Sequence, residues 1–457
     1  MKAAFKFKLG SEISPGLVTV GRFDGKHPSL AAATPTGKIV LHSPHGSGGS
    51  GGFSAGFSAG GSGDPAIRHL KMSSSITAIA AGCVKPGESR ADALLIGTET
   101  TLQAYSTEEN RDLFFTDVGD GISSIVCGYL GAVPADAPGG RFLRRGAPVS
   151  SSAGGKSSSS SSSSSSSASD GGAAVSNVLP PTVFAGGDLS VHGFGDSGEE
   201  TFWTVTGGNI GAMALMDVDG DGRNELLVGS DDYEIRTFRG EEVVCETTET
   251  APITHLCPMS SSSSRHTHDS SGKDKTSSKL FAYGLSNGTL GVYNGSSSRV
   301  WRMKSKNTLT AVASFDIDGD GVPEVCSGWS NGKFEVRRDR DGSVVFKDKI
   351  GSPVAGLVVG DYRLDGAEQI VVCSQSGSVR GYLPFEGVAG TQLLKEKEED
   401  TAVNELLAQK QELLLALRGI EGSVKQLKNG EPAGAGTIDP DTKVTLTTEV
   451  NIPHRCL

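Results

Sequence analysis

The sequence predicts an all-β chain whose main part is a seven-bladed β-propeller, and two observations carry this prediction. First, an apolar run, a small residue, a polar turn and an alternating apolar–polar run recur together, which is the pattern of a β-hairpin. Second, one small hairpin sheet cannot bury both of its faces, so seven copies in a chain favour a ring of sheets. The seven copies occupy residues 32–42, 96–105, 185–194, 228–238, 283–293, 327–337 and 372–382.

The spacing of the repeats matches the length of a propeller blade. The small residues before the turns, which serve as markers, are Ala33, Gly97, Gly186, Gly229, Gly284, Gly328 and Cys373. Three of the intervals between successive markers are short and nearly equal, close to the roughly 40–50 residues of a four-stranded blade. The three long intervals contain Gly- and Ser-rich tracts, which lack the apolar side chains that offset the entropy of ordering. We therefore expect residues 1–385 to form the ring, with disordered insertions near 46–63, 134–176 and 260–278.

Three repeats share a longer frame of an aromatic residue, an aspartate and the marker. The aromatic residues Trp203, Trp301 and Phe346 precede Asp217, Asp316 and Asp361 by nearly equal intervals, the first of which is shorter by a single position. The marker follows the aspartate at the same interval in all three repeats. The frame predicts that these three segments occupy the same place in three different blades.

Two of these aspartates open the strongest candidate for a metal site. The segments DVDGDGRNE (217–225) and DIDGDGVPE (316–324) carry acidic residues at positions 1, 3, 5 and 9, separated by glycines. Oxygens at this spacing can surround a hard cation such as calcium, and similar loops join blade strands in integrin-type propellers. The candidate ligands are Asp217, Asp219, Asp221, Glu225, Asp316, Asp318, Asp320 and Glu324.

The alternative interpretation of the same loops is a tight turn whose carboxylates accept hydrogen bonds from backbone amides. The third copy, DYRLDGAEQ (361–369), keeps the frame although Arg363 replaces the second carboxylate and Gln369 the last. That substitution favours the turn. A calcium-binding propeller module of the integrin type remains the alternative function for the whole chain.

The sequence contains no indication of an enzyme. GLSNG (284–288) and GWSNG (328–332) match the GxSxG pattern of serine hydrolases, but the residues that follow alternate as a strand. A nucleophile elbow needs a helix there. No Ser/His/Asp or Cys/His set can be assembled from the remaining residues.

Composition excludes several other classes. A net charge of -11 argues against a nucleic-acid partner, which needs a basic face. No apolar run reaches the ~18–20 residues of a membrane span. The seven cysteines are scattered without a CxxC pair, which indicates reduced thiols in the cytoplasm.

After the ring, residues 386–430 predict a linker and an amphipathic helix. Apolar residues alternate at spacings of 3 and 4, as at heptad positions a and d, with one lysine among them. Such a helix of about three and a half heptads is marginal alone, so a coiled coil with a partner is expected; packing on its own ring is the alternative. The a and d residues are Val403, Leu406, Lys410, Leu413, Leu417, Ile420, Val424 and Leu427.

Residues 431–457 turn extended and predict the first strand of a further β domain, cut short at the end of this chain. Val444 and Leu446, followed past a pair of threonines by Val450 and Ile452, give the strand pattern. The remainder of that domain is expected to be missing from this chain, because a lone strand leaves an unpaired edge.

Several long segments together resemble one known family. They include ISPGLVTVGRFDGKHPSLAAATPTGKIVLHSPH (13–45), FWTVTGGNIGAMALMDVDGDGRNELLVGS (202–230), GWSNGKFEVRRDRDG (328–342) and ELLAQKQELLLALR (405–418). These segments resemble the family of the second Bardet–Biedl syndrome protein, a core subunit of the BBSome, the coat-like complex of ciliary membrane traffic. The resemblance covers roughly residues 12–430 outside the insertions.

The resemblance implies a propeller, a coiled-coil helix that pairs with a paralogous propeller subunit, and an adaptin-ear-like domain that begins within 431–457. It implies a non-enzymatic scaffold or adaptor of the BBSome in ciliogenesis and ciliary membrane-protein trafficking. Other implied partners are cargo proteins and an Arf-like GTPase that recruits the complex. The implied locations are the cytoplasm, the cilium, the periphery of the ciliary membrane and the basal body or centrosomal region. No cofactor is implied beyond the calcium considered above.

Overall fold

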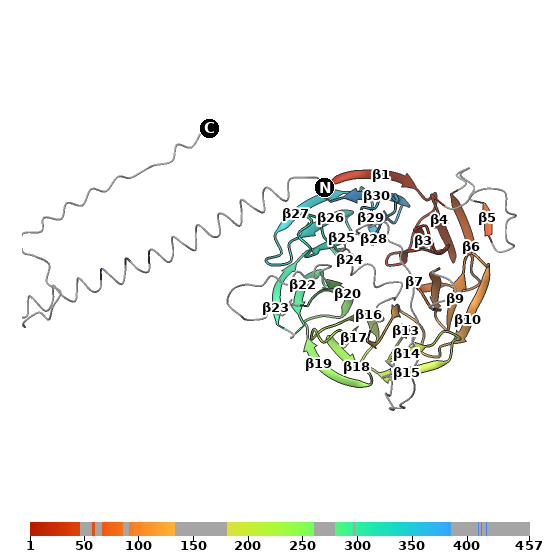
Figure 1. Cartoon of the computed structure of the whole chain (residues 1–457), viewed down its shortest axis with the longest axis horizontal. Helices are drawn as coiled ribbons and strands as arrows, with labels where there is room; N and C mark the ends of the chain where they lie inside the picture. The colour runs from red at the N-terminus through yellow and green to blue at the C-terminus, as the bar shows by residue number, and fades with distance from the viewer. Residues whose placement is uncertain are drawn as a thin grey trace, which may run out of the picture. The chain divides into compact units, whose positions relative to one another are not determined.

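The computed structural model shows seven β-sheets arranged in a ring around a central axis (Figure 1). It describes residues 1–45, 57–59, 66–85, 91–132, 181–259, 279–295 and 298–384, and the helical residues Lys410, Leu413 and Leu417. The chain divides into two units, Met1–Glu386 and Gly387–Leu457, and each is described by itself. The first unit is the ring, and it confirms the predicted seven-bladed propeller.

Each blade is an antiparallel sheet of four main strands, with short additions in two blades. Blades 1 and 2 contain β2 (Val18–Gly21), β3 (Ser29–Ala33), β4 (Lys38–His42) and β6 (Ile67–Lys71), then β7 (Ile76–Gly82), β8 (Ala93–Thr98), β9 (Thr101–Ser106) and β10 (Arg111–Asp117). Blades 3 and 4 contain β11 (Ser124–Gly128), β13 (Thr182–Gly186), β14 (Ser190–Phe194) and β15 (Glu200–Val205), then β16 (Ile210–Met216), β17 (Arg223–Ser230), β18 (Glu234–Arg239) and β19 (Glu242–Thr248).

The second half of the ring repeats this plan. Blades 5 and 6 contain β20 (Ile253–Met259), β21 (Leu280–Leu285), β22 (Thr289–Asn294) and β23 (Arg299–Lys304), then β24 (Leu309–Phe315), β25 (Glu324–Trp329), β26 (Lys333–Arg337) and β27 (Val344–Lys349). Blade 7 contains β28 (Val354–Gly360), β29 (Gln369–Ser374), β30 (Ser378–Leu383) and, from the other end of the chain, β1 (Lys2–Lys8).

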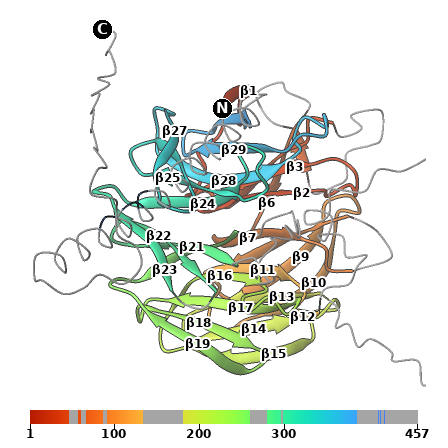
Figure 2. The same ribbon diagram turned by 60° about the vertical axis from the view of Figure 1, so that its left-hand side comes forward.

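The two ends of the ring join within blade 7. Strand β1 pairs antiparallel with β30, so that the sheet has the order β1-β30-β29-β28. The first strands of successive blades also contact one another around the whole circle, and β28 of blade 7 contacts β2 of blade 1. The turned view shows the sheets lying face to face as successive layers (Figure 2).

The marker residues allow this close approach of neighbouring blades. Every marker lies in the second strand of its blade, and a Cβ atom added to Gly229 would stand 2.3 Å from Cγ2 of Ile253, in the first strand of the next blade. The same clash would arise at Gly284 with Leu309, at 2.3 Å. Because the next blade occupies the space of a side chain, the repeat requires a small residue at this position.

The hydrophobic core lies between the blades. Strand alternation sends successive side chains to opposite faces of a sheet, and each face packs on the adjacent blade. Phe184 and Phe202 of blade 3, for example, cluster with Ile210 and Phe238 of blade 4, and all four are buried.

Two short strands extend beyond the regular plan. Strand β5 (Phe57–Ala59), inside the first predicted insertion, pairs with β6, and β12 (Gly131–Ala132) pairs with β17. The rest of the three predicted insertions, and residues 431–457, lie outside the described residues. No helix in the described part of the chain is long and apolar enough to cross a membrane.

Candidate functional site: the acidic loops of blades 4, 6 and 7

The three loops of the shared frame occupy equivalent places. Loop 217–225 joins β16 to β17, loop 316–324 joins β24 to β25, and loop 361–369 joins β28 to β29. Each loop thus connects the first and second strands of its blade. The prediction that they are structural equivalents is confirmed.

The aromatic residue of the frame needs a correction in one blade. In blades 5 and 6, Trp301 pairs with Val292 and Phe346 pairs with Val336, each next to a register shift between the third and the outer strand. In blade 3 the residue next to the corresponding shift is Phe202, which pairs with Gly193. With Phe202 in the frame, the interval from aromatic residue to aspartate becomes equal in all three copies. Trp203, which the sequence frame used, points to the opposite face and is 54% exposed.

The first aspartate of each loop holds the turn by accepting two backbone hydrogen bonds. Asp217 accepts them from Gly220 and Gly222 at 2.6 and 3.1 Å. Both glycines have a φ of 85°, which glycine adopts at little steric cost. The corresponding bonds measure 2.7 and 2.9 Å at Asp316, and 3.1 and 2.9 Å at Asp361.

The last side chain of each loop is buried and reaches back to the start of the loop. Glu225 accepts a hydrogen bond from the amide of Val218 at 2.9 Å, and Glu324 accepts one from Ile317 at 2.9 Å. Gln369 does the same for Arg363 at 3.1 Å without any charge. The turn therefore forms with or without the full set of carboxylates, as the turn interpretation expects.

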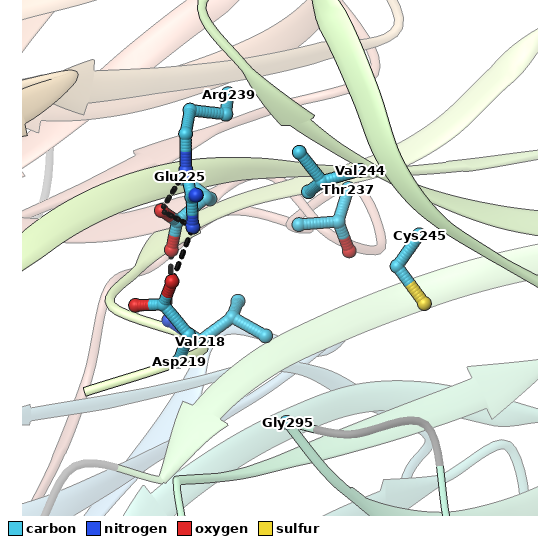
Figure 3. Close-up of a pocket in the computed structure, with 8 residues that line it drawn as sticks. All are labelled: Val218, Asp219, Glu225, Thr237, Arg239, Val244, Cys245 and Gly295. Carbon is cyan, nitrogen blue, oxygen red and sulfur yellow. Dashed lines mark hydrogen bonds and ion pairs between the residues drawn. The ribbon is translucent and has the colours of Figure 1, made fainter. Parts of the chain in front are cut away.

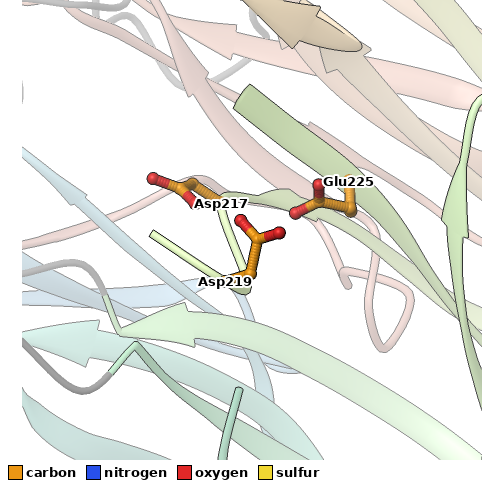
Figure 4. Close-up of side chains that lie close together, drawn as sticks. All are labelled: Asp217, Asp219 and Glu225. Carbon is orange, nitrogen blue, oxygen red and sulfur yellow. The ribbon is translucent and has the colours of Figure 1, made fainter. Parts of the chain in front are cut away.

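In blade 4 three carboxylates of the acidic loop lie close together (Figure 4), and basic side chains from outside the loop pair with them. Oxygens of Asp217, Asp219 and Glu225 lie within 4.8 Å of one another, whereas Asp221 is not part of this group. Arg239 reaches both Asp219 and Glu225, at 3.0 Å to the latter, and Lys279 lies 3.3 Å from Asp217. The guanidinium of Arg239 balances part of the negative charge of the loop.

A pocket of about 310 Å³ opens beside this ion pair (Figure 3). Arg239, Asp219 and Glu225 form its charged wall, where the single guanidinium pairs with both carboxylates. The remaining lining residues are Val218, Thr237, Val244, Cys245 and Gly295. The carboxylates of this loop form a candidate group for a metal ion, and that hypothesis stays a prediction.

In blade 6 the acidic loop carries four carboxylates, and the positive charge of Arg338 acts on one of them, Asp318. Oxygens of Asp316, Asp318 and Asp320 lie within 4.8 Å of one another, and Glu324 lies buried behind them. Burial, reinforced by the three neighbouring carboxylates, raises the pKa of Glu324 to about 8. Burial likewise raises the pKa values of Asp316 and Asp318. The calcium hypothesis stays a prediction, and the charges favour blade 6 over blade 4.

The sequence patterns did not reveal the two cations of blade 4. Arg239 is the last residue of β18, the strand that follows β17, and Glu225 lies in β17. Lys279 follows the third predicted insertion, whereas Asp217 precedes it. The pairing of Leu226 with Phe238 places Glu225 opposite Arg239, so correct strand register would have found the arginine. No local signal marks Lys279.

The hydrolase-like patterns lie in hairpin turns, as predicted. Ser286 lies in the turn between β21 and β22, and Ser330 in the turn between β25 and β26. Asn287 accepts hydrogen bonds from both the amide and the hydroxyl of Thr289, which closes the first turn. Neither serine precedes a helix, so neither can be a nucleophile elbow.

Three of the predicted partner-binding residues lie within the described part of the second unit. Lys410, Leu413 and Leu417 are helical, and the two leucines are 71% and 53% exposed. The other five, Val403, Leu406, Ile420, Val424 and Leu427, lie outside the described residues. The coiled coil therefore stays a prediction.

Comparison with known proteins gives a consistent result. Two descriptions of one family match the chain: "Ciliary BBSome complex subunit 2, N-terminal" over residues 19–128 and its "middle region" over 212–337. "BBSome complex member BBS2" of Mus musculus is 39% identical over 452 residues, 98% of this chain and 54% of the mouse protein. The chain thus spans about half the length of the curated relatives it matches.

One more distant sequence and one solved structure are also similar to parts of this chain. "BBSome complex member BBS7" of Mus musculus is 26% identical over 186 residues, which are 39% of this chain and 24% of the mouse protein. The crystal structure of BBS1N in complex with ARL6DN superposes with a TM-score of 0.57 at 13% identity, over 84% of this chain and 98% of that one. At that identity the likeness shows the propeller fold alone.

Proposed function

The chain belongs to the ciliary BBSome complex subunit 2 family, and from this membership we propose that it is a non-enzymatic scaffold subunit of the BBSome. Its part in the complex is to hold other subunits together during ciliary membrane-protein trafficking and ciliogenesis. The complex containing it acts in the cytoplasm and the cilium, at the periphery of the ciliary membrane and near the basal body.

The observation that carries this proposal is the extent of the sequence match. Identity of 39% extends over 452 of the 457 residues, so the match includes the ring and the helical segment after it. A shared propeller alone would support far less, because one fold serves many unrelated functions.

The ring suits a scaffold because its recurring motifs serve the structure. The loops 217–225 and 316–324 use their carboxylates to fix turns, and the GxSxG-like segments are hairpin turns. The loops and outer strands of the seven blades are the surfaces through which the ring contacts other proteins.

The helical segment is the proposed contact with a paralogous propeller subunit. Leu413 and Leu417 are exposed, and Lys410 occupies the one polar a position. A lysine at that position disfavours pairing of identical helices and selects a partner that supplies an acidic group. The relative BBS7 supports the idea that subunits related to this chain take part in the same complex.

Recruitment by an Arf-like GTPase belongs to the proposal at the level of the complex. The structure of BBS1N with ARL6DN describes that contact for another propeller of the same fold. Cargo proteins of the ciliary membrane are proposed as partners of the assembled complex, through its combined surface.

Affinity purification of the tagged full chain from ciliated cells tests the proposal. The double variant Leu413→Glu/Leu417→Glu introduces charge at two predicted interface positions of the helix. We expect recovery of BBSome subunits to fall at least about tenfold, since central apolar anchors dominate such interfaces. The melting temperature of the ring should not change. Gln411→Glu, at the outward heptad position b, is the matched control.

Equal recovery of BBSome subunits with the double variant would show that the coiled-coil assignment is wrong. Recovery of no BBSome subunit with the unmodified chain would contradict the proposed function itself. The two outcomes are distinguishable because the first affects only the variant.

A further inference from the structure

The outer surface of blade 3 carries an apolar cluster that the propeller does not use. Leu189, Trp203 and Val205 are 54%, 54% and 59% exposed. Leu189 accepts a hydrogen bond from Thr206, so the turn that carries it lies beside the end of β15. We name these three residues, with Asp120, Asp188 and Glu200 around them, the rim patch.

Trp203 has no role in packing the core of blade 3. Phe202 is the residue that fills the core, where it packs edge-on against Phe184 with ring centroids 5.5 Å apart. Trp301, the tryptophan in the equivalent place of blade 5, is buried and donates its indole N–H to Asp339. Within the described residues the indole of Trp203 has no such acceptor, and its large apolar surface faces solvent.

The rim patch lies on a free sheet edge without the usual protection. Strand β15 is the last strand of its sheet, and exposed edges are normally protected by lysines or prolines. Its sequence, ETFWTV, contains no Lys, Arg or Pro, and neither does that of β19, EVVCETT, whereas the outer strands β1, β23 and β27 carry two to three Lys or Arg residues each. Among the described strands of the ring, none pairs with the outer edge of β15.

The charge around this edge is strongly negative. Residues 91–132 and 181–259, which form most of blades 2 to 4, contain 22 Asp and Glu against 4 Lys and Arg. The other described residues of the ring contain 13 Asp and Glu against 22 Lys and Arg. Within the patch, Asp120 and Glu200 are about half exposed and share the single imidazole of His192.

We propose that the rim patch binds an extended, Lys- and Arg-rich segment of a partner protein, which adds a strand to the edge of β15. Main-chain hydrogen bonds along the edge supply affinity in such strand addition, and side-chain contacts supply specificity. The cations of the segment lie beside Asp120, Asp188 and Glu200, and one of them stacks on the face of Trp203. The surface is defined by this ring alone and does not depend on the assembly proposed above.

Tryptophan fluorescence of the full chain provides a direct assay. Of the three tryptophans, Trp301 and Trp329 are 8% and 1% exposed, so acrylamide quenching reports mainly on Trp203. The probe is a fluorescein-labelled peptide that alternates Lys with Val and Thr. We expect saturable binding that protects Trp203 from acrylamide and weakens as salt rises from about 50 to about 200 mM, because the contacts are partly between exposed charges.

Variants on two outer strands separate the patch from general attraction to an acidic protein. In the double variant Trp203→Ala/Val205→Ser we expect about a tenfold loss of peptide affinity, measured by fluorescence anisotropy, as for central interface anchors. The matched control is Val344→Ser, on β27 of blade 6, where the side chain is 43% exposed; it should leave the affinity unchanged. N-methylation of alternate peptide amides should abolish binding.

A first group of four results would overturn the proposal. They are absence of saturable binding, equal binding by the double variant, equal binding of a peptide with Glu in place of Lys, and protection of Trp203 by self-association, which sedimentation would detect. An increase in peptide affinity after replacement of residues 134–176 by a short linker would also overturn it. That increase would assign the patch to the chain's own basic segment RFLRR (141–145).

Discussion

At the scale of single residues, the absence of a Cβ atom at the marker glycines lets neighbouring blades pack closely. The marker Gly229 lies against Ile253 of the next blade, and Gly328 lies against Val354 in the same way, with a clash at 2.5 Å for an added Cβ. A glycine in a strand interior is normally unfavourable. Its recurrence here follows from the space that the next blade takes.

We predict that Gly229→Ala destabilises the ring although alanine suits a strand better than glycine. The added methyl group meets Ile253 and must displace it, which costs about 1–3 kcal/mol of unfolding free energy. Urea denaturation followed by circular dichroism measures the loss. Gly119→Ala is the control, because a Cβ there meets nothing within 4 Å, and an unchanged midpoint for Gly229→Ala would contradict the packing argument.

At the scale of elements, the three equivalent loops differ in how their negative charge is compensated. Loop 217–225 pairs its carboxylates with Arg239, loop 361–369 replaces the last carboxylate with Gln369, and loop 316–324 retains a buried Glu324 among aspartates. The backbone turn is alike in all three. The balance of charge therefore differs without any change in the element itself.

We predict a pH-dependent stability from Glu324. Its folded pKa, about 8, lies above the ordinary value near 4.5, so the folded state keeps a proton that the unfolded chain releases. The stabilisation from this proton is complete below about pH 4.5 and is lost as the pH rises to about 8. In a chelator-containing buffer, Glu324→Gln should therefore raise the melting temperature at pH 8 and flatten its decline from pH 5.

The reverse exchange in blade 7 is the control for this prediction. Gln369→Glu places a buried acid beside Asp365 and should make the melting temperature fall more steeply above pH 5. Repeating both measurements with millimolar calcium tests the metal hypothesis, which expects stabilisation of the unmodified chain and none of Glu324→Gln. A pH profile identical for all three proteins would contradict the charge argument.

At the scale of the whole molecule, the first strand of the chain closes the ring. Phe7 of β1 stacks on His42 of blade 1 with ring centroids 4.1 Å apart, and it also stacks on Tyr362 of blade 7. The strand thus completes one blade through hydrogen bonds and contacts the next through its side chains. Closure pairs the edge of β30, and the lysine-bearing β1 becomes the outer strand of blade 7.

We predict that Phe7→Ala weakens this closure. The half-buried ring contributes apolar contacts to two blades, so its removal should cost about 2–3 kcal/mol of unfolding free energy, somewhat below the cost at a fully buried site. Denaturant titration and limited proteolysis near residue 1 measure the effect. Lys6→Ala, exposed on the same strand, should be neutral; equal stability of both variants would show that β1 is dispensable for closure.

Local patterns predicted much of this molecule. Seven hairpins, their spacing, the acidic turns and the hairpin nature of the GxSxG-like segments all depend on residues close in sequence, where alternation and turn chemistry act directly. The frame was wrong by one position at Phe202 and Trp203 because alternation shows that one aromatic faces inward and one outward, but not which. A register shift in the outer strand decides that.

The sequence by itself therefore determined the repeated hairpin and the family of the chain. The tertiary structure decided which charged side chains of separate elements form ion pairs and which side chains are exposed. Arg239 and Lys279 reach the blade 4 loop from another strand and another blade, and in blade 6 the positive charge of Arg338 acts on Asp318. Trp203 is left outside because Phe202 fills the core. Both outcomes depend on strand register and blade order, which bring together residues that no local pattern connects.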